Sequence, residues 1–397
     1  MIIYNKTWLS NLYLHKQSEQ LRAAGCLTHE ELATIKAKYL VGFYTPGIFI
    51  RIGLFLLTCI IISFSFGLLS LMFTATQIIE TPGWSLFLGI ICVVALEYMV
   101  KTKNHYRSGV DDALQWIAFG TLAGSITWLI FSLNHGYQDP SYLTISLVVF
   151  ITSSYFTLRF ANIVMGAATC ISFFAVLFFA WKNTGAFGNA TMPFLIMLVS
   201  AIAYVLALRL SHQLKTPFYA PIIIDIQMIS LLVLYAAGNY FVIDNLNNTL
   251  NETTGTATVA KIPFAFFFWM WTMLLPLVYI ARGIMKKDVI ILRIGLLLAV
   301  AAIYTFRNYY HILSIELALI AGGIILLAIT YSVIRYLKIP RHRFTYADTD
   351  NTDTMDSIKL ESLIAAETLG HVPGAPTTTA NRFGGGDFGG GGSGGGF

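Results

Sequence analysis

Ten separate apolar runs, each about long enough to cross a bilayer, dominate this chain of 397 residues. A helix needs about 20 predominantly apolar residues to span the hydrocarbon core of a membrane. The runs predict spanning helices at residues 48–73, 84–100, 113–133, 142–160, 163–181, 194–210, 219–241, 264–280, 289–304 and 315–336. The sequence therefore predicts an all-α fold, a polytopic transmembrane helix bundle of about ten spans.

The composition also indicates a membrane protein. Charged residues make up 11% of the chain and apolar residues 56%, whereas soluble domains carry about 25% charged residues. The formal net charge is +5, but the basic residues are scattered at the ends of the apolar runs and form no single patch. This distribution is typical of topology determinants, and it argues against a nucleic-acid partner.

Lys and Arg residues near the ends of the runs predict the orientation of the bundle. An even number of spans places both termini on one side, which carries seventeen of these basic residues against three on the other. The seventeen are Lys36, Lys38, Arg51, Lys101, Lys103, Arg107, Arg159, Arg209, Lys215, Arg282, Lys286, Lys287, Arg293, Arg335, Lys338, Arg341 and Arg343, and the three are Lys182, Lys261 and Arg307. Because cytoplasmic loops retain basic residues, both termini are expected in the cytoplasm.

The chain divides into four regions by composition. We expect a cytoplasmic helical hairpin at 1–47, the transmembrane domain at 48–338, a cytoplasmic linker with a short amphipathic helix at 339–383, and a disordered glycine-rich tail at 384–397. The tail is either an inert flexible segment or a weak adhesive in which Phe side chains and Arg382 make the contacts. An expression linker would have a similar composition.

Two short helices joined by a turn are expected within residues 7–40. Thr28 and Glu31 have the spacing of a capping box, in which each side chain accepts a hydrogen bond from the other residue's backbone amide. Gly25 is the expected left-handed stop of the first helix. The hairpin is interpreted either as a cap folded over the cytoplasmic loops or as a docking site for a soluble cytoplasmic protein.

The stretch LRAAGCLTHEELATIKAKY, followed after a short spacer by GIFIRIGLFLLTCIIISFSFGLLSLMF, carries a resemblance to a known family. It is similar to the opening of an uncharacterised family of predicted bacterial membrane proteins, which begin with a cytoplasmic hairpin and continue into many spans. The resemblance implies a location in the bacterial inner membrane. It implies no catalytic residues, because the family has no assigned activity.

Charged residues at membrane depth often mark function, since an unpaired charge there costs at least about 2.5 to 3.5 kcal/mol. Glu97 precedes Lys101 by four residues, the spacing of an ion pair on a helix. Asp225 lies about two turns into the seventh run, and Arg293 lies one turn into the ninth. All four are expected near the cytoplasmic side, where they either line a shallow polar cavity or pair off at the interface.

Two further groups of polar residues lie at the ends of apolar runs. Arg307, His311 and Glu316 form a candidate cluster on the outer side, interpreted as an interfacial anchor or as an anion or proton site. Asp111 and Asp112 are expected to cap the third spanning helix, where their charge favours the helix dipole. Capping explains this acidic pair without a metal ion.

Motifs of known chemistry are absent from the sequence. It contains no HExxH and no phosphate-binding GxxxxGKS or GxxxxGKT, and its four cysteines lack CxxC spacing. We therefore nominate no catalytic residue, cofactor or metal site, and we do not expect an enzyme.

Three functional hypotheses follow from these patterns. The leading one is a noncatalytic membrane component that recruits or senses a partner through residues 1–47 and the C-terminal tail, with the lipid bilayer as its other contact. The alternative is a small-solute or ion transporter or channel, based on the number of spans and the candidate polar cluster. A third hypothesis, a membrane enzyme acting on a lipid or isoprenoid substrate, has no nominated nucleophile or metal ligand.

Overall fold

The computed structural model describes six continuous segments of the chain. They are residues 2–23, 25–133, 142–213, 217–253, 264–286 and 288–310, with single positions at 317, 320, 323, 324, 327, 328, 331 and 335. Within these segments the secondary structure is helical, and the β-type pairing found there is one isolated bridge between Tyr44 and His105. The expected linker at 339–383 and the tail at 384–397 lie outside the described residues.

The helices follow the apolar runs along the chain. In order they are α1 (Lys6–Ala23), α2 (His29–Lys38), α3 (Ile48–Met72), η1 (Thr74–Thr76), η2 (Ile78–Glu80), α4 (Pro82–Thr102), α5 (Val110–Leu133), α6 (Tyr142–Phe160), α7 (Ile163–Lys182), α8 (Ala186–Gln213), η3 (Pro217–Tyr219), α9 (Ala220–Ala236), α10 (Tyr240–Thr253), α11 (Ala265–Lys286) and α12 (Val289–Tyr310).

Eight of these helices are long and apolar enough to cross a membrane, and the bent pair α9 and α10 adds a ninth if it is counted as one span. Each of the first nine expected spans therefore coincides with a helix or a bent helix pair. The tenth, 315–336, falls outside the described segments except for single positions. An all-helical, multi-pass membrane protein fits these observations.

Apolar side chains point outward along the spanning helices as well as inward. Helix α3 has no buried residue along its length, and its Phe64 and Leu71 side chains are 76% and 72% exposed. Soluble proteins rarely expose such continuous apolar surface. In a bilayer the same surface contacts lipid chains, so its exposure carries no cost.

The seventh expected span, 219–241, is not one continuous helix, which corrects the sequence prediction. Helix α9 ends at Ala236 and α10 begins at Tyr240, with a bend of 67° between them. The composition of residues 242–263, rich in Asn and Thr, also predicts a flexible external loop, but its first part is helical, because α10 continues to Thr253. Residues 254–263 lie outside the described segments.

Polar side chains at the α9–α10 break replace the hydrogen bonds that a continuous helix would make. Asn239 Oδ1 accepts a hydrogen bond from the Val242 amide at 3.2 Å, and Thr272 Oγ1 of α11 accepts one from the Tyr240 amide at 2.9 Å. The Asn239 amide group also donates to Thr305 Oγ1 of α12 at 3.2 Å. Irregular backbone is tolerated at membrane depth only where neighbouring groups satisfy it in this way.

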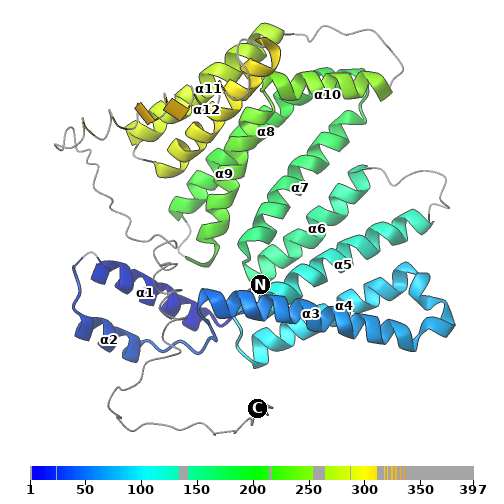
Figure 1. The fold of residues 1–397 in the computed structure, drawn as a ribbon, viewed down its shortest axis with the longest axis vertical. Coiled ribbons are helices and arrows are strands. Elements are labelled where there is room, and N and C mark those ends of the chain that lie inside the picture. Colours follow the sequence, from blue (N-terminus) through cyan, green and yellow to red (C-terminus); the bar gives the residue numbers. More distant parts are fainter. Residues whose placement is uncertain are drawn as a thin grey trace, which may run out of the picture.

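Figure 1 shows the spanning helices arranged in chain order, from α3 and α4 at one end of the molecule to α11 and α12 at the other. Neighbours in sequence pack in pairs: α4 with α5, α6 with α7, α8 with α9 and α11 with α12. Within the described residues these pairs form two buried cores, one including Phe156 of α6 and one including Tyr279 of α11. Contacts of α7 with α8 and α9 join the helices of the first core to those of the second.

Helices α1 and α2 form a hairpin joined by a short turn. The capping box is present, because Thr28 Oγ1 accepts a hydrogen bond from the Glu31 amide at 3.2 Å and Glu31 Oε2 accepts one from the Thr28 amide at 2.8 Å. Those hydrogen bonds from Thr28 lower the pKa of the Glu31 carboxyl. Gly25 has a φ of +74°, the left-handed conformation that glycine adopts without strain.

The hairpin is folded onto the membrane helices through its first residues. Tyr4 and Leu9 are 7% and 4% exposed and belong to the core that includes Phe156. The Ile3 amide donates to the Arg159 carbonyl, at the end of α6, at 3.0 Å. This arrangement matches the interpretation of the hairpin as a cap, while its outer face stays exposed.

The connections on the side of the hairpin are tied together by hydrogen bonds. The bridge between Tyr44 and His105 joins the segment before α3 to the α4–α5 connection. The Tyr219 hydroxyl, just before α9, donates to the Leu158 carbonyl of α6 at 2.9 Å. Helix α10 lies at the opposite end of the bundle (Figure 1).

Helices α11 and α12 approach each other closely at two glycines. A Cβ atom on Gly283 would lie 2.7 Å from the Leu292 amide nitrogen, and one on Gly295 would lie 2.9 Å from the Ile280 amide nitrogen. Small residues at helix interfaces allow this approach in membranes, where van der Waals packing drives association. Because the obstructing atoms belong to the backbone, no side-chain rotation could relieve the clash.

We expect Gly283→Leu to separate α11 from α12 and to lower the stability of the purified protein in detergent. The expected cost is about 1–3 kcal/mol, as for overpacking of a filled interface, and thermal unfolding monitored by intrinsic fluorescence measures it. Gly120→Leu is the matched control, since a Cβ at Gly120 meets no atom within 4 Å. Equal melting temperatures for the two variants would contradict the close-packing account.

Candidate functional site

Glu97 of α4 binds two cations. The ion pair expected from the sequence is present, with Lys101 Nζ 2.8 Å from Glu97 Oε2. The other carboxylate oxygen, Oε1, accepts a hydrogen bond from Arg159 Nη2 of α6 at 2.8 Å. Sequence reasoning missed Arg159 as a partner, because 62 residues separate it from Glu97 and no local pattern links the two.

Asp225 and Arg293 do not join Glu97, so the predicted polar cluster is not formed. Asp225 of α9 is close enough to Cys170 of α7 for an electrostatic interaction, and Arg293 of α12 is exposed, with no ion pair to a described residue. Helices α5, α6 and α7 lie between α4 and α9 in the arrangement of Figure 1. The sequence predicts that these residues lie at a similar depth in the membrane, but it does not show which helices are neighbours.

The expected outer-side cluster is only partly within the described residues. Arg307 lies in the last turn of α12, whereas His311 and Glu316 lie outside the described segments. The cluster therefore stays a prediction.

Asp111 and Asp112 do not cap the first-turn amides of α5, which corrects the expected roles. Asp111 accepts hydrogen bonds from the backbone amides of Arg107 and Ser108, at 2.7 and 2.8 Å, in the preceding loop. Asp112 accepts from Arg51 Nε and Nη2 of α3, at 2.9 and 2.6 Å. Because α5 begins at Val110, both carboxylates lie inside its first turn and bind groups outside the helix.

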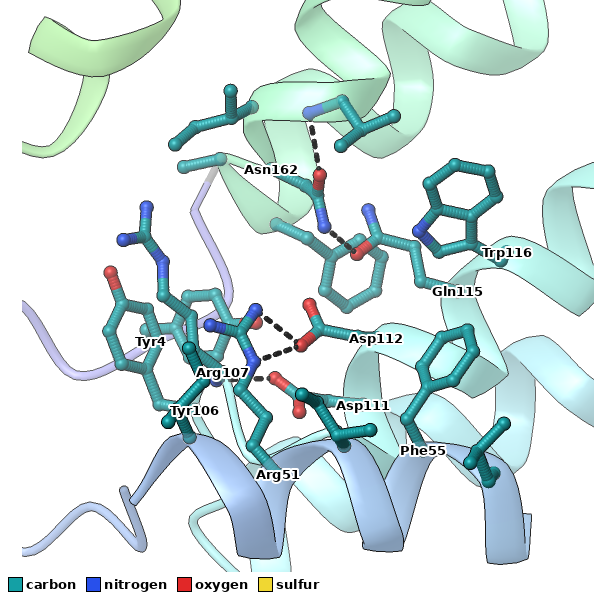
Figure 2. A pocket seen from close by; sticks show the side chains of 18 residues that line it. Tyr4, Arg51, Phe55, Tyr106, Arg107, Asp111, Asp112, Gln115, Trp116 and Asn162 are labelled. Atoms are coloured by element: carbon teal, nitrogen blue, oxygen red, sulfur yellow. Dashed lines mark hydrogen bonds and ion pairs between the residues drawn. The ribbon is translucent and has the colours of Figure 1, made fainter. Parts of the chain in front are cut away.

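A cavity of about 530 Å³ lies beside this ion pair, within the range of small-molecule sites. We call it the interfacial pocket, and its walls are α3, the α4–α5 connection, the start of α5, the α6–α7 turn and Tyr4. Figure 2 shows Arg51 reaching across from α3 to Asp112, with Tyr4 on one side of the view and Phe55 on the other.

Gly109 holds the α3 wall of the pocket in place. Its φ of +94° is disfavoured for other residues, and a Cβ there would collide with the Arg51 carbonyl oxygen of α3. This backbone contact sets α3 against the loop before α5. The Arg51 side chain can therefore reach Asp112.

Gln115, which lines the pocket, has a buried donor that is left unsatisfied. Asn162 Oδ1 caps α7 by accepting a hydrogen bond from the Val164 amide at 2.9 Å, so Asn162 Nδ2 is the group that donates to Gln115 Oε1, at 3.0 Å. That bond turns Gln115 Nε2 away from Asn162. Gln115 is 3% exposed, and its Nε2 has no hydrogen-bond partner among the described residues.

The two arginines of the pocket differ in their partners. The Arg51 guanidinium is neutralised by Asp112. The Arg107 guanidinium lies 5.6 Å from the centre of the Tyr106 ring and makes no ion pair with a described residue. Because Asp111 binds loop amides and Asp112 binds Arg51, Arg107 is the cation left available to a ligand.

Aromatic side chains close the pocket beneath the hairpin. The Tyr4 ring lies 4.9 Å from that of Tyr106 and 6.5 Å from that of Phe160, measured between centroids. Burial, with the nearby Asp111 charge as the next cause, raises the pKa of the Tyr4 phenol well above its usual value, and burial raises the pKa of Tyr106. Both phenols are therefore neutral at physiological pH.

The remaining wall of the pocket is apolar and open to the surroundings of the helices. Its residues are Ile48, Ile52, Phe55, Leu56, Trp116, Ile163 and Val164. Leu56 and Ile52 are more than half exposed, on the first turns of a spanning helix. The pocket thus combines an apolar opening with a few polar side chains, as ligand-binding sites do. The described residues hold no group of three metal-ligating side chains.

Comparison with protein-family profiles, curated protein sequences and solved structures finds no match for this chain. The resemblance of the opening residues to a family of bacterial membrane proteins therefore stays a prediction. The geometry of the interfacial pocket is therefore the basis for proposing a function.

Proposed function

We propose that this chain is a noncatalytic protein of the bacterial inner membrane that senses an occupant of the interfacial pocket and signals it to a cytoplasmic protein. The single observation behind the proposal is the double role of Tyr4. Tyr4 lines the pocket and is also part of the buried core that anchors the α1–α2 hairpin. A ligand that displaces Tyr4 would therefore move the hairpin.

The outer face of the hairpin is available to a partner. Tyr13 and Leu21 of α1 are 46% and 48% exposed, and Tyr is one of the residue types enriched in protein interfaces. Only the inner residues of the segment pack on the membrane helices. Recruitment and capping are thus compatible roles for residues 1–47. We extend the recruiting role to the C-terminal tail, on the sequence argument alone.

The orientation that we propose places about ten spans in the membrane, with both termini in the cytoplasm. Five basic residues support it, because they lie in the connections on the hairpin side or in the helix turns next to them, and cytoplasmic connections retain basic residues. They are Arg51, Lys101, Lys103, Arg107 and Arg159.

The exposed Cys26 in the α1–α2 turn tests this orientation. A membrane-impermeant maleimide is expected to label Cys26 in inside-out vesicles and to leave it unlabelled in intact spheroplasts. Cys92 and Cys170 are buried, and Cys26→Ser gives the background from the other three cysteines. Labelling of Cys26 from outside intact spheroplasts would overturn the proposed orientation.

Site-specific photocross-linking tests the sensing function in living cells. A photoreactive amino acid in place of Tyr13 is expected to give a discrete protein adduct, and Val164→Trp, which fills the pocket, is expected to change the adduct yield several-fold. Ile151→Trp is the matched control, because Ile151 is 58% exposed on α6 and does not line the pocket.

The outcomes of this experiment distinguish recruitment of a partner by the hairpin from sensing through the pocket. The absence of any discrete adduct from Tyr13 would contradict recruitment by the hairpin. An adduct whose yield is the same in the wild type and in the Val164→Trp variant would contradict sensing through the pocket.

A transporter is the second candidate function, and one observation favours it. Asp225 Oδ2 is buried without a hydrogen-bond partner among the described residues, and so is Ser230 Oγ on the same helix. An unpaired carboxylate inside a spanning helix is costly and typical of ion and proton pathways. Helix α9 is also the broken one, and interrupted helices often form transport sites.

If the chain conducts protons or a proton-coupled solute, Asp225→Asn should lower proton flux into reconstituted vesicles about ten-fold or more, because the titratable carboxylate is removed. A pH-sensitive dye inside the vesicles measures the flux under an imposed potential. Asp244→Asn is the control, since the Asp244 carboxylate already accepts a hydrogen bond from the Tyr309 hydroxyl of α12 at 2.6 Å. Equal flux in the wild type and in Asp225→Asn would remove this candidate.

A further inference from the structure

We propose that a second cavity, beneath helix α10, binds one hydrocarbon chain of a bilayer lipid. The cavity has a volume of about 360 Å³, and its walls come from residues 174–179 of α7, 192–196 of α8, 233–237 of α9 and 242–246 of α10. We call it the α10 cavity. It lies at the end of the bundle opposite the hairpin, where α10 runs across the end of α7 (Figure 1), so the inference goes beyond the function proposed for the interfacial pocket.

Small side chains leave the α10 cavity open. Ala175 of α7 and Ala236 and Ala237 of α9 contribute only methyl groups to its walls. The floor is buried, since Phe174 and Met192 are 6% and 1% exposed. Protein interiors are close-packed, with few voids larger than a water molecule. A space of this size among buried side chains therefore calls for an occupant.

The α10 wall of the cavity is held by contacts with α11 and α12. The Asp244 carboxylate accepts a hydrogen bond from the Tyr309 hydroxyl at 2.6 Å, and the Tyr240 ring stacks on that of Trp269 with 4.7 Å between centroids. The Tyr240 amide also donates to Thr272 Oγ1 at 2.9 Å. The cavity is thus a built part of the fold and not a gap beneath a loose helix.

The chemistry of the walls selects a hydrocarbon. The lining residues are all Phe, Ala, Met, Pro, Ile, Val or Leu, so a polar group inside the cavity would lose its hydrogen bonds to water without finding a side-chain partner. Apolar cavities of about 150 Å³ stay dry and bind benzene, and by the same scale the α10 cavity has room for roughly a dozen carbon atoms. This size fits part of one acyl chain.

The position of the cavity identifies the bilayer as the source of the chain. Helices α7 and α8 fit membrane spans. The cavity leads from Val242 at its rim, which is 42% exposed, to Ile243, which is 7% exposed. Asn245 and Asn248 of α10 are exposed, and a helix with one apolar and one polar side is typical of the membrane surface. A lipid whose headgroup lies beside α10 can therefore place one chain beneath it.

Photolabelling of the full chain in reconstituted vesicles tests the inference. The first probe is phosphatidylethanolamine with a diazirine midway along one acyl chain, and the second carries the diazirine on its headgroup. We expect the chain probe to label Phe174 and Met192, because lipid outside the cavity does not reach these buried side chains. The headgroup probe should label neither, and tandem mass spectrometry of proteolytic peptides locates the adducts.

Two variants assign the labelling to the cavity. Ala175→Phe fills it from α7, and Val242→Trp obstructs its exposed rim, where a larger side chain is tolerated. Each should lower the labelling of Met192, relative to that of the exposed Phe64 on α3, at least about five-fold, because a filled space excludes the chain. Ala180→Phe is the matched control, since Ala180 is exposed on the same helix and does not line the cavity; it should leave the ratio unchanged.

Each contrary outcome overturns a stated part of the inference. If the chain probe labels neither Phe174 nor Met192, no lipid chain occupies the cavity. Equal labelling of these residues by the two probes would overturn the assignment of a chain in place of a headgroup. An unchanged ratio in both Ala175→Phe and Val242→Trp would show that the chain reaches Met192 by another route.

Discussion

The outward-facing apolar surface of the spanning helices is the constraint on which the rest of this structure depends. Side chains such as Phe64 are largely exposed, so lipid must replace water around them, and every backbone amide at that depth then needs a partner inside the protein. Long helices meet this requirement for most of the chain. Where α9 gives way to α10, side chains from Asn239 and Thr272 supply the missing partners, and the chain can bend without exposing polar backbone to lipid.

Because apolar burial provides little drive for association within a bilayer, close packing and polar contacts hold the helices together. Glycines let α11 and α12 meet at backbone distance, and Glu97 joins α4 to α6 through Arg159. At the hairpin side the membrane core continues into the N-terminal segment through Tyr4 and Leu9. The hairpin, which is too small to be stable alone, gains its stability from that contact.

The interfacial pocket is a consequence of how α3 is held. Helix α3 packs mainly against α5, and it is fixed at the Gly109 loop and by the pair of Arg51 with Asp112. These contacts lie along one side of α3 and leave a space toward the α6–α7 turn. The space is lined by α3, residues 106–116, the α6–α7 turn and Tyr4, so under the proposed function an occupant would act on both the first span and the hairpin.

The sequence by itself determined the helical class, the positions of eight apolar helices long enough to cross a membrane and the Thr28 and Glu31 capping box, because hydropathy and capping are local properties of one helix or one turn. The tertiary structure alone decided the partners of charged residues: Glu97 with Arg159 instead of Asp225 and Arg293, and Asp112 with Arg51 instead of its own helix amides. The Gly238–Asn239 dipeptide was a readable signal for the break that the hydropathy run concealed. The pocket had no such signal, since its walls come from α3, the α4–α5 connection, α5 and the α6–α7 turn, which meet only when these helices pack together.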